Sequence, residues 1–250
     1  MHENSRSFLY GFGVFSTIRI MNGELFLWEK HWRRLGANAA KLGIDVAAYS
    51  EENVKQQIKE IIAKENILSG KARITFADDS PSDIWPVDAK KKTTLQIISG
   101  DLQPVSDNLR LTISPYIANS GSPLAGIKSC NYLEKILALD EARARGFDEA
   151  IQINERGEVT SGTMANLFWI KGEVLFTPSL KTGCLPGTTR EFVMENLECR
   201  EVEVMLDELD AADAIFLTSA GLGVVEVAEF ESRRFDRLDH PIVDLLPSAI

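Results

Sequence analysis

Residues 127–154, IKSCNYLEKILALDEARARGFDEAIQIN, join a single lysine to a helical pattern and then to a strand pattern. The run 131–145 predicts a helix, and Gly146 stands where a C-terminal glycine belongs. The apolar residues of this helix lie on one broad face: Leu133, Ile136, Leu137 and Leu139. The next run, 149–154, is typical of a strand. Helix and strand in such close succession favour a chain of mixed helices and strands.

Strand and helix patterns also alternate toward the N-terminus. GVFSTIRI (13–20) and GELFLW (23–28) predict a hairpin, because the Asn22-Gly23 pair between them strongly favours a tight turn. The other elements expected before residue 100 are helices over 29–42 and about 51–65, and strands over 73–77 and 93–99. Residues 78–92 between the last two strands are polar and rich in turn-forming residues.

The stretch GDLQPVSDN (100–108) predicts a linker, because it has no apolar periodicity. Beyond it the expected elements are strands over 109–116, 149–154, 166–172, 174–178, 201–206 and 214–219, and a helix over 189–198. The sequence therefore predicts an α/β (α+β) chain of two domains. They are a small domain over 1–100 and a larger one over 109–250 that carries Lys128, with a linker over 101–108.

The excess of acidic over basic residues limits the kinds of partner that the protein can bind. With 27 Lys and Arg against 37 Asp and Glu in 250 residues, the net charge is −10. Nucleic acid and anionic membrane surfaces are therefore disfavoured as partners. No apolar run is long enough to span a bilayer, and no secretory signal is recognisable. The odd cysteine count of 3 and the 3 histidines favour a cytoplasmic protein with reduced thiols and no metal site.

Lys128 is the first residue that could carry chemistry. It lies in SPLAGIKSCNY (122–132) between apolar neighbours, just before the helix over 131–145. Desolvation disfavours an ammonium, and in this way a lysine becomes an amine nucleophile that forms a Schiff base. The alternative is a lysine that extends its ammonium to water over an apolar surface. This segment alone favours the alternative.

A second candidate is LPGTTREF (185–192), in which Gly187 precedes Thr188 and Thr189 at the start of a predicted helix. Exposed backbone N–H groups and two hydroxyls at the positive end of a helix can bind a phosphate. Thr188 could equally be a simple helix cap, and the two interpretations carry similar weight. Arg34 could add charge-assisted hydrogen bonds to such a phosphate, although one arginine on an amphipathic helix is usually only solvated.

Two further segments have polar ends. Residues 157–180 predict a hairpin with small and hydroxyl residues at 160–163 and a turn at Lys171-Gly172. Residues 216–227, FLTSAGLGVVEV, predict an apolar strand that ends in a loop of Ser, Ala and Gly. Such a loop lets backbone N–H groups approach an anion, or it is only a tight turn.

The order of these segments resembles the class IV aminotransferase family, the fold-type-IV enzymes that use pyridoxal 5′-phosphate (PLP). The resemblance covers Tyr10 to about Val227. It is carried by YGFGVFSTIRI…NGELF…HWRRL, IKSCNYL…EARARGFDEAIQIN, GEVTSGTMANLFWI…VLFTPSL…CLPGTTR and FLTSAGLGVVEV. Several separated motifs in the right order are more specific than any one of them. The resemblance implies a two-domain fold like those of the D-amino-acid and branched-chain aminotransferases, and a homodimer.

The resemblance also implies a role for each candidate. Lys128 would hold PLP covalently and move the substrate's Cα proton, while Arg34 would bind the phosphate. The other positions fall into two groups. Those implied around the cofactor are Ser161, Asn166, Thr188, Thr189, Ser219 and Ala220, and those on the substrate side are Tyr10, Phe15 and Ser16.

Three positions depart from the family pattern. Phe12 and Ser16 replace the aspartate and glutamate of the usual YGDGVFET, and Ser161 replaces the glutamate that pairs with the pyridine nitrogen. A carboxylate keeps that nitrogen protonated and the ring strongly electron-withdrawing, whereas a hydroxyl makes only a neutral hydrogen bond. We therefore expect weaker stabilisation of a carbanion, and slower or different chemistry.

Within the family, the short chain, the SCNY after Lys128 and the runs MANLFW and LGVVEV resemble 4-amino-4-deoxychorismate lyase. That enzyme releases pyruvate and forms 4-aminobenzoate in folate biosynthesis. The alternatives are a branched-chain or D-amino-acid transaminase, and a family member that binds PLP but is catalytically impaired.

Overall fold

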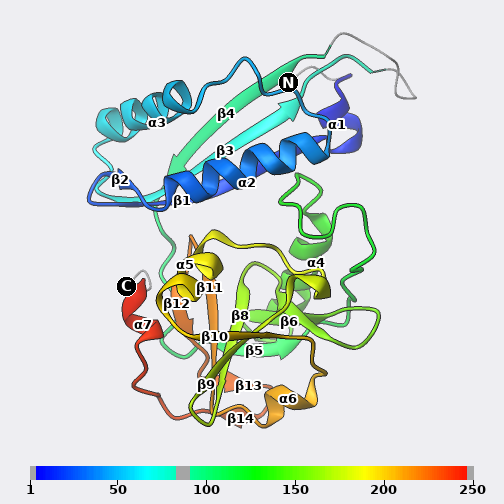
Figure 1. Ribbon diagram of the computed structural model, residues 1–250, viewed down its shortest axis with the longest axis vertical. Coiled ribbons are helices and arrows are strands. Elements are labelled where there is room, and N and C mark those ends of the chain that lie inside the picture. The colour runs from blue at the N-terminus through cyan, green and yellow to red at the C-terminus, as the bar shows by residue number, and fades with distance from the viewer. Residues whose placement is uncertain (1–3, 83–90, 247–250) are drawn as a thin grey trace. The chain divides into compact units, whose positions relative to one another are not determined.

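The structure is a computed structural model that describes residues 4–82 and 91–246. The chain divides into two compact units (Figure 1). The N-terminal unit is Met1–Leu102 together with Ile127–Tyr132, and the C-terminal unit is Gln103–Gly126 together with Leu133–Ile250. The segment that carries Lys128 thus belongs to the N-terminal unit, which differs from the domain boundaries expected from the sequence.

The N-terminal unit is built on a four-stranded sheet in the order β2-β1-β3-β4. Every strand pair in it is antiparallel. Its elements are α1 (Arg6–Tyr10), β1 (Gly13–Met21), β2 (Glu24–Leu25), α2 (Trp28–Lys41), α3 (Glu51–Glu65), β3 (Ser69–Asp78) and β4 (Thr93–Gly100). The expected hairpin, both helices and both strands are present, but the second hairpin strand, expected over 23–28, is only Glu24–Leu25, and Trp28 begins α2. The part of the polar stretch 78–92 that spans 83–90 lies outside the described residues.

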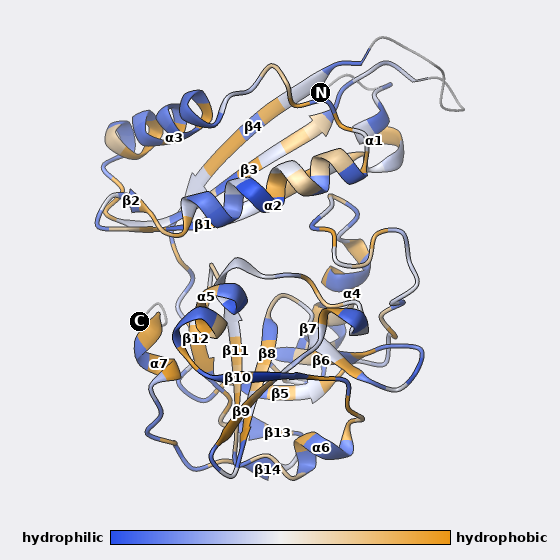
Figure 2. Ribbon diagram, viewed as in Figure 1, coloured by the Kyte–Doolittle hydropathy of each residue, from blue (hydrophilic) through white to orange (hydrophobic). Residues whose placement is uncertain are grey.

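One face of this sheet is covered by helices. Even-numbered residues of β1, such as Val14 and Ile18, pack in one core with Leu35 of α2 and with Val54 and Ile58 of α3. Both helices therefore contact the same face, since side chains alternate along a strand. Figure 2 shows α3 with hydrophobic and hydrophilic residues on different sides, as this packing requires. The odd-numbered residues of β1, including Phe15, lie on the other face.

Two local features fix β1. Its turn to β2 has Asn22 at φ 51° and Gly23 at φ 76°, the left-handed pair that a two-residue hairpin needs. At its other end, the segment Ile127–Tyr132 adds alongside it like a short strand. The N–H of Phe15 donates to the Lys128 carbonyl at 3.0 Å, and the N–H of Cys130 donates to the Gly13 carbonyl at 2.8 Å. The backbone of Lys128 is thereby fixed beside Phe15.

The C-terminal unit contains two five-stranded sheets, ordered β10-β9-β8-β11-β12 and β14-β13-β5-β6-β7. Its strands are β5 (Arg110–Ile113), β6 (Glu149–Ile153), β7 (Val159–Gly162), β8 (Asn166–Lys171), β9 (Val174–Pro178), β10 (Cys199–Val202), β11 (Ala214–Ser219), β12 (Gly223–Glu226), β13 (Glu229–Phe230) and β14 (Arg233–Arg234). Its helices are α4 (Leu133–Ala144), η1 (Leu180–Thr182), α5 (Thr188–Asn196), α6 (Asp207–Asp210) and α7 (Ile242–Leu245). A shared core that includes Leu111, Ile151, Leu167 and Leu217 joins the two sheets.

The helix expected over 131–145 is present as α4, but its buried side is not the expected apolar face. Its buried residues are Ala138, Leu139 and Ala142, the small ones allowing close packing. Leu133 is 67% exposed, and Ile136 and Leu137 are also exposed. No helix in the described parts of the chain is long and apolar enough to cross a membrane.

Candidate functional site

Lys128 lies among aromatic side chains of the N-terminal unit. Its Nζ donates to the hydroxyl of Tyr132 at 3.1 Å. The same ammonium lies 4.5 Å from the ring centre of Phe15 and 4.8 Å from that of Tyr132. These two rings meet edge to face at 5.1 Å. The rings of Phe15 and Tyr132, together with the Tyr132 hydroxyl, therefore orient the Lys128 amine. Phe15 was expected from the sequence on the substrate side, whereas Tyr132 was not singled out, although it lies only four residues after the lysine.

Ser16 and Arg34 meet inside the same unit. Arg34 Nη2 donates to Ser16 Oγ at 2.8 Å, and Ser16 Oγ lies 2.9 Å from Nδ1 of His31. An arginine can only donate, so the Ser16 oxygen accepts from it and the Ser16 proton is available for the lone pair of His31. Ser16 and His31 are almost completely buried. This cluster fixes the direction of the Arg34 guanidinium.

The imidazole of His31 is neutral. Burial holds the pKa of His31 well below its usual value, and the positive charges of Arg34 and Lys128 lower this pKa further. The sequence reasoning missed His31, although the HWRRL motif places it one helical turn before Arg34 on α2. A neutral histidine adds no positive charge beside the two cations.

Arg73 lies against the ring of Phe15. Its guanidinium carbon lies 3.6 Å from the centre of the Phe15 ring, and its Nε donates to Thr75 Oγ1 at 3.3 Å. Burial raises the pKa of the Cys130 thiol, and Arg73 only partly offsets this. Cys130 is therefore a neutral thiol. Arg73 was also missed, because one arginine in a strand pattern carries no signal of its own. Tyr10 ends α1 in this unit.

In the C-terminal unit, Asn166 shapes the loop that leads into α5. Its Nδ2 donates to the Leu185 carbonyl at 2.8 Å. Gly187 is the N-cap of α5, and a Cβ there would lie only 1.9 Å from Asn166 Oδ1. Position 187 therefore needs a glycine because a larger side chain would collide with Asn166. The backbone angles at this position are ones that any residue can adopt. Thr188 and Thr189 follow as the first buried residues of the helix, as expected.

An unused hydroxyl lies on the same face as Asn166. Thr218 is the direct antiparallel partner of Asn166, so both side chains leave the sheet on one side. Thr218 is completely buried, and its Oγ1 has no hydrogen-bond partner within the described part of the chain. The N–H groups at the start of a helix and a buried hydroxyl without a partner are both groups that can donate to an anion. We call Gly187, Thr188, Thr189 and Thr218 the anion cup.

The next residues, Ser219 and Ala220, form the turn between β11 and β12. Ser219 Oγ accepts a hydrogen bond from the N–H of Leu222 at 3.1 Å, which stabilises the turn. Ala220 offers only its backbone there.

Ser161 lies in β7, directly opposite Gln152 of β6. It is 5% exposed, and its hydroxyl makes no hydrogen bond with any residue of 4–82 or 91–246. The Ser161 hydroxyl is not one of the fully buried side-chain atoms without a partner, so it remains accessible to solvent or to a ligand. The same described residues contain no cluster of His, Cys, Asp or Glu that could hold a metal ion.

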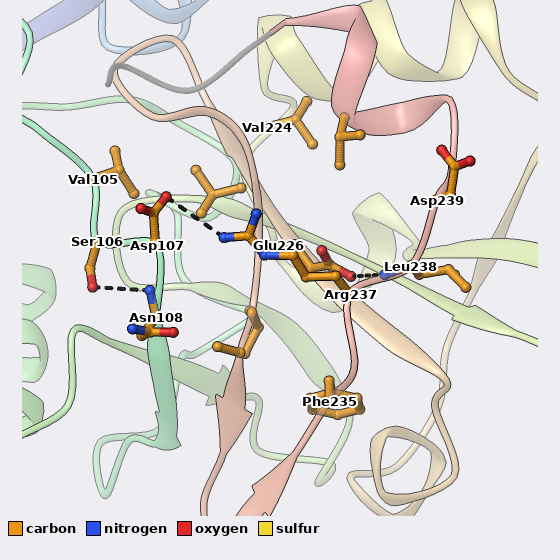
Figure 3. A pocket seen from close by; sticks show the side chains of 14 residues that line it. Val105, Ser106, Asp107, Asn108, Val224, Glu226, Phe235, Arg237, Leu238 and Asp239 are labelled. Carbon is orange, nitrogen blue, oxygen red and sulfur yellow. Dashed lines mark hydrogen bonds and ion pairs between the residues drawn. The ribbon is translucent and has the colours of Figure 1, made fainter.

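A surface cavity of about 530 Å³ elsewhere in the C-terminal unit contains none of the predicted residues (Figure 3). Three of its four charged side chains, those of Asp107, Glu226 and Arg237, contact neighbouring groups. Arg237 pairs with Asp107 at 3.8 Å, and Glu226 accepts from the N–H of Leu238 at 2.9 Å.

Comparison with known proteins identifies the family. The family model "Amino-transferase class IV" matches residues 13–230. An aminodeoxychorismate lyase of Bacillus subtilis is 30% identical over 234 residues, covering 90% of this chain and 79% of its own. A D-alanine aminotransferase of Bacillus licheniformis is 30% identical over 234 residues, covering 91% of this chain and 82% of its own.

Solved structures agree with this match. A branched-chain aminotransferase from Thermoproteus uzoniensis, solved with norvaline, has a TM-score of 0.89 at 28% identity. The match covers 98% of this chain and 86% of that chain. The mixed helix and strand fold expected from the sequence is confirmed. The protein belongs to the class IV aminotransferases, and as a member of this family it is a PLP-dependent enzyme.

Proposed function

We propose that the protein is a 4-amino-4-deoxychorismate lyase, which releases pyruvate from its substrate and forms 4-aminobenzoate for folate biosynthesis. The observation that carries the assignment of the site is the Lys128 amine, held between the Phe15 and Tyr132 rings with its Nζ 3.1 Å from the Tyr132 hydroxyl. An amine oriented in this way can bind a carbonyl carbon and then exchange protons with a bound substrate.

Each unit has residues whose chemistry suits a part of PLP. Lys128 would hold the cofactor covalently, and Arg34, aligned by Ser16, would bind the phosphate. The anion cup would supply N–H groups and hydroxyls to the same phosphate, and this gives the buried Thr218 hydroxyl a partner. Ser219 and Ala220 would close the cup. Asn166 would hold the loop before α5 in place through its hydrogen bond to the Leu185 carbonyl. Ser161 would face the ring nitrogen.

When bound, PLP would withdraw electrons from the substrate carbon that bears the amine. The Lys128 amine would accept the proton from this carbon, and Tyr132 would orient the amine for that transfer. The C–O bond to the side group then breaks, and this group leaves as pyruvate once it has gained a proton. Tyr10, Phe15 and Ser16 are proposed for the substrate side. Arg73, stacked on Phe15, places a positive charge there that suits an anionic substrate.

Ser161 favours the lyase over a transaminase. A hydroxyl does not supply the negative charge that a glutamate gives the ring nitrogen, so the electron sink is weaker. The lyase reaction forms an aromatic ring, and this contributes much of its driving force. A transaminase reaction forms no aromatic ring, so it depends more on the electron-withdrawing power of the cofactor ring. The similarity to the B. subtilis lyase supports the same choice.

The test is a product assay on the purified protein with PLP. With aminodeoxychorismate as substrate, we expect pyruvate and 4-aminobenzoate in equal amounts from the wild type and neither product from Lys128→Ala. If no pyruvate forms, while an amino acid and a keto acid exchange their amino group, the lyase assignment is wrong.

The second candidate is a transaminase for a branched-chain or D-amino acid, and it is favoured by the D-alanine aminotransferase relative. An exchange assay over a panel of L- and D-amino acids separates it from the lyase. Bound cofactor without turnover of any amine would instead indicate an impaired family member.

We also propose a cytoplasmic homodimer. Exposed Leu133, Ile136 and Leu137 on α4 are an apolar strip that a second copy would cover. The three cysteines form no disulfide, as expected in a reducing compartment. Sedimentation tests the dimer, and Leu137→Glu would shift it toward monomer.

A further inference from the structure

Arg156 is a half-exposed arginine that the proposed function does not use, and it lies in the turn between β6 and β7. Its Nη1 donates to Oγ of Ser120 at 2.6 Å and to Oε1 of Glu155 at 3.0 Å. Its Nη2 donates to Oε2 of Glu158 at 2.6 Å and to the carbonyl of Lys181 at 3.0 Å. Arg156 thereby joins three segments that are distant in the sequence: the loop after β5, its own turn and η1.

The positive charge of Arg156 is balanced inside this turn. Hydrogen bonds from the hydroxyl and the N–H of Ser120 lower the pKa of Glu155 to about 2. The hydrogen bond from Arg156 lowers the pKa of Glu158. Both carboxylates are therefore negatively charged at neutral pH, and the guanidinium lies between them. Arg156 is thus suited to holding segments together rather than to binding an anion itself.

Asn154 of the same turn also binds η1. It is 1% exposed, and its Nδ2 donates to Oε2 of Glu158 at 2.8 Å and to the carbonyl of Thr182 at 3.3 Å. The last carbonyls of a helix have no partner within the helix. The turn supplies donors to two of them, from Arg156 to Lys181 and from Asn154 to Thr182, so it fixes the end of η1.

The loop that leads from η1 to α5 is held along its length. It starts at Gly183, where φ is 92° and a Cβ would lie only 2.9 Å from Cα of Ser120. Further along, the carbonyl of Leu185 accepts from Nδ2 of Asn166 at 2.8 Å. The loop ends at Gly187, the N-cap of α5. Because this connection is short and closely packed, a displacement of η1 would also displace the N–H groups at the start of α5.

We propose that Arg156, together with Asn154, is a positioning residue that directs the anion cup toward the phosphate of PLP. The inference rests on the proposed function, which assigns the cup to that phosphate. Neither residue would touch the cofactor. N–H groups at a helix start bind an anion tightly only when they are already directed at it. The turn therefore controls how tightly the phosphate is bound, and it has no effect on the ring or the aldehyde.

The test compares the dissociation constants of PLP and of pyridoxal, which has the same ring and aldehyde but no phosphate. The wild type should bind PLP far more tightly than pyridoxal. Arg156→Ala should bind PLP about tenfold more weakly, the usual effect of losing a residue that orients ligand-binding groups. Its affinity for pyridoxal should not change.

Arg110→Ala is the matched control. The Arg110 side chain is 45% exposed against 44% for Arg156, and it binds the carboxylate of Glu229 and the carbonyl of Gly146 instead of η1. This variant should change neither affinity. Amide hydrogen exchange of the protein without ligand gives a second measurement. Exchange over residues 180–187 should be faster in Arg156→Ala than in the wild type, and unchanged in Arg110→Ala.

The ratio of the two affinities decides the question. An unchanged ratio in folded Arg156→Ala overturns the inference, whether both affinities stay the same or both fall, as does unchanged exchange over 180–187. Where Arg156→Ala does not fold, Arg156→Lys keeps the charge between the two glutamates but replaces two donor groups with one. It should lower the ratio as well, and an unchanged ratio again overturns the inference. A wild type that binds PLP no more tightly than pyridoxal has no phosphate site, and this result contradicts the proposed function itself.

Discussion

Arg34 Nη2 lies 2.8 Å from Ser16 Oγ, and this hydrogen bond joins the phosphate-binding candidate on α2 to the strand that leads from Phe15. A glutamate is usual at the position of Ser16 in the family. It would neutralise the guanidinium, whereas the hydroxyl orients it and leaves its charge for a ligand. The departure at Ser16 therefore has a structural meaning that the sequence alone did not provide.

Ser16→Ala should destabilise the protein and weaken PLP binding. The substitution removes the partner of two buried groups, Arg34 Nη2 and His31 Nδ1, at a cost of about 1–3 kcal/mol in the free energy of unfolding. We expect about tenfold weaker PLP binding because the guanidinium loses its alignment. Denaturant unfolding and a PLP titration measure both effects. Ser69→Ala, at an exposed position of β3, is the control. Unchanged affinity in Ser16→Ala would show that Arg34 does not depend on this bond.

Gly187→Ala should damage the anion cup. The new Cβ would lie 1.9 Å from Asn166 Oδ1, so the asparagine must move and release the Leu185 carbonyl. We expect a loss of about 1–3 kcal/mol in the free energy of unfolding and a large loss of PLP affinity. Gly36→Ala is the matched control, because a Cβ in the middle of α2 would meet nothing within 4 Å. It should stabilise the protein by up to about 1 kcal/mol. Equal behaviour of the two variants would contradict this account of the cup.

His31 should make the protein sensitive to mild acid. Its pKa is lowered in the folded state, while that of an unfolded chain is about 6.5. Above that pH both states are neutral and stability does not depend on this group. As the pH falls below it, only the unfolded state gains the proton, so stability falls by about 1.4 kcal/mol per pH unit until the folded pKa is reached.

Unfolding free energies between about pH 7 and 5 measure this slope. His31→Gln should have a shallower dependence than the wild type. His240→Gln is the comparison, because the pKa of the more exposed His240 is also lowered by burial. It should retain most of the wild-type slope. A slope unchanged by His31→Gln would contradict a neutral buried imidazole.

Local sequence signals predicted much of the fold. Ser50 caps α3 as its hydroxyl accepts from the N–H of Asn53, and the Asn22-Gly23 turn has the expected backbone angles. The apolar face of α4 was a poor guide to its buried side, because helical periodicity reports an apolar stripe but not what covers it. Short strands such as β12 were missed, since a few residues carry little pattern.

Site residues could be predicted from the sequence only where they belong to a recognisable motif. Lys128 and the loop before α5 belong to motifs, so the sequence located them. The alignment of Arg34 by Ser16 and the stacking of Arg73 on Phe15 join residues distant in sequence. Such contacts depend on strand register and helix packing, which no local pattern encodes.

The most direct test of the central claim is to reduce the PLP-loaded protein with borohydride and map the modified peptide by mass spectrometry. A cofactor bound covalently to Lys128 predicts one phosphopyridoxyl group per chain, on that residue alone, and none on the same peptide of Lys128→Ala. A group fixed to another lysine, or no modification of the loaded wild type, would contradict the account.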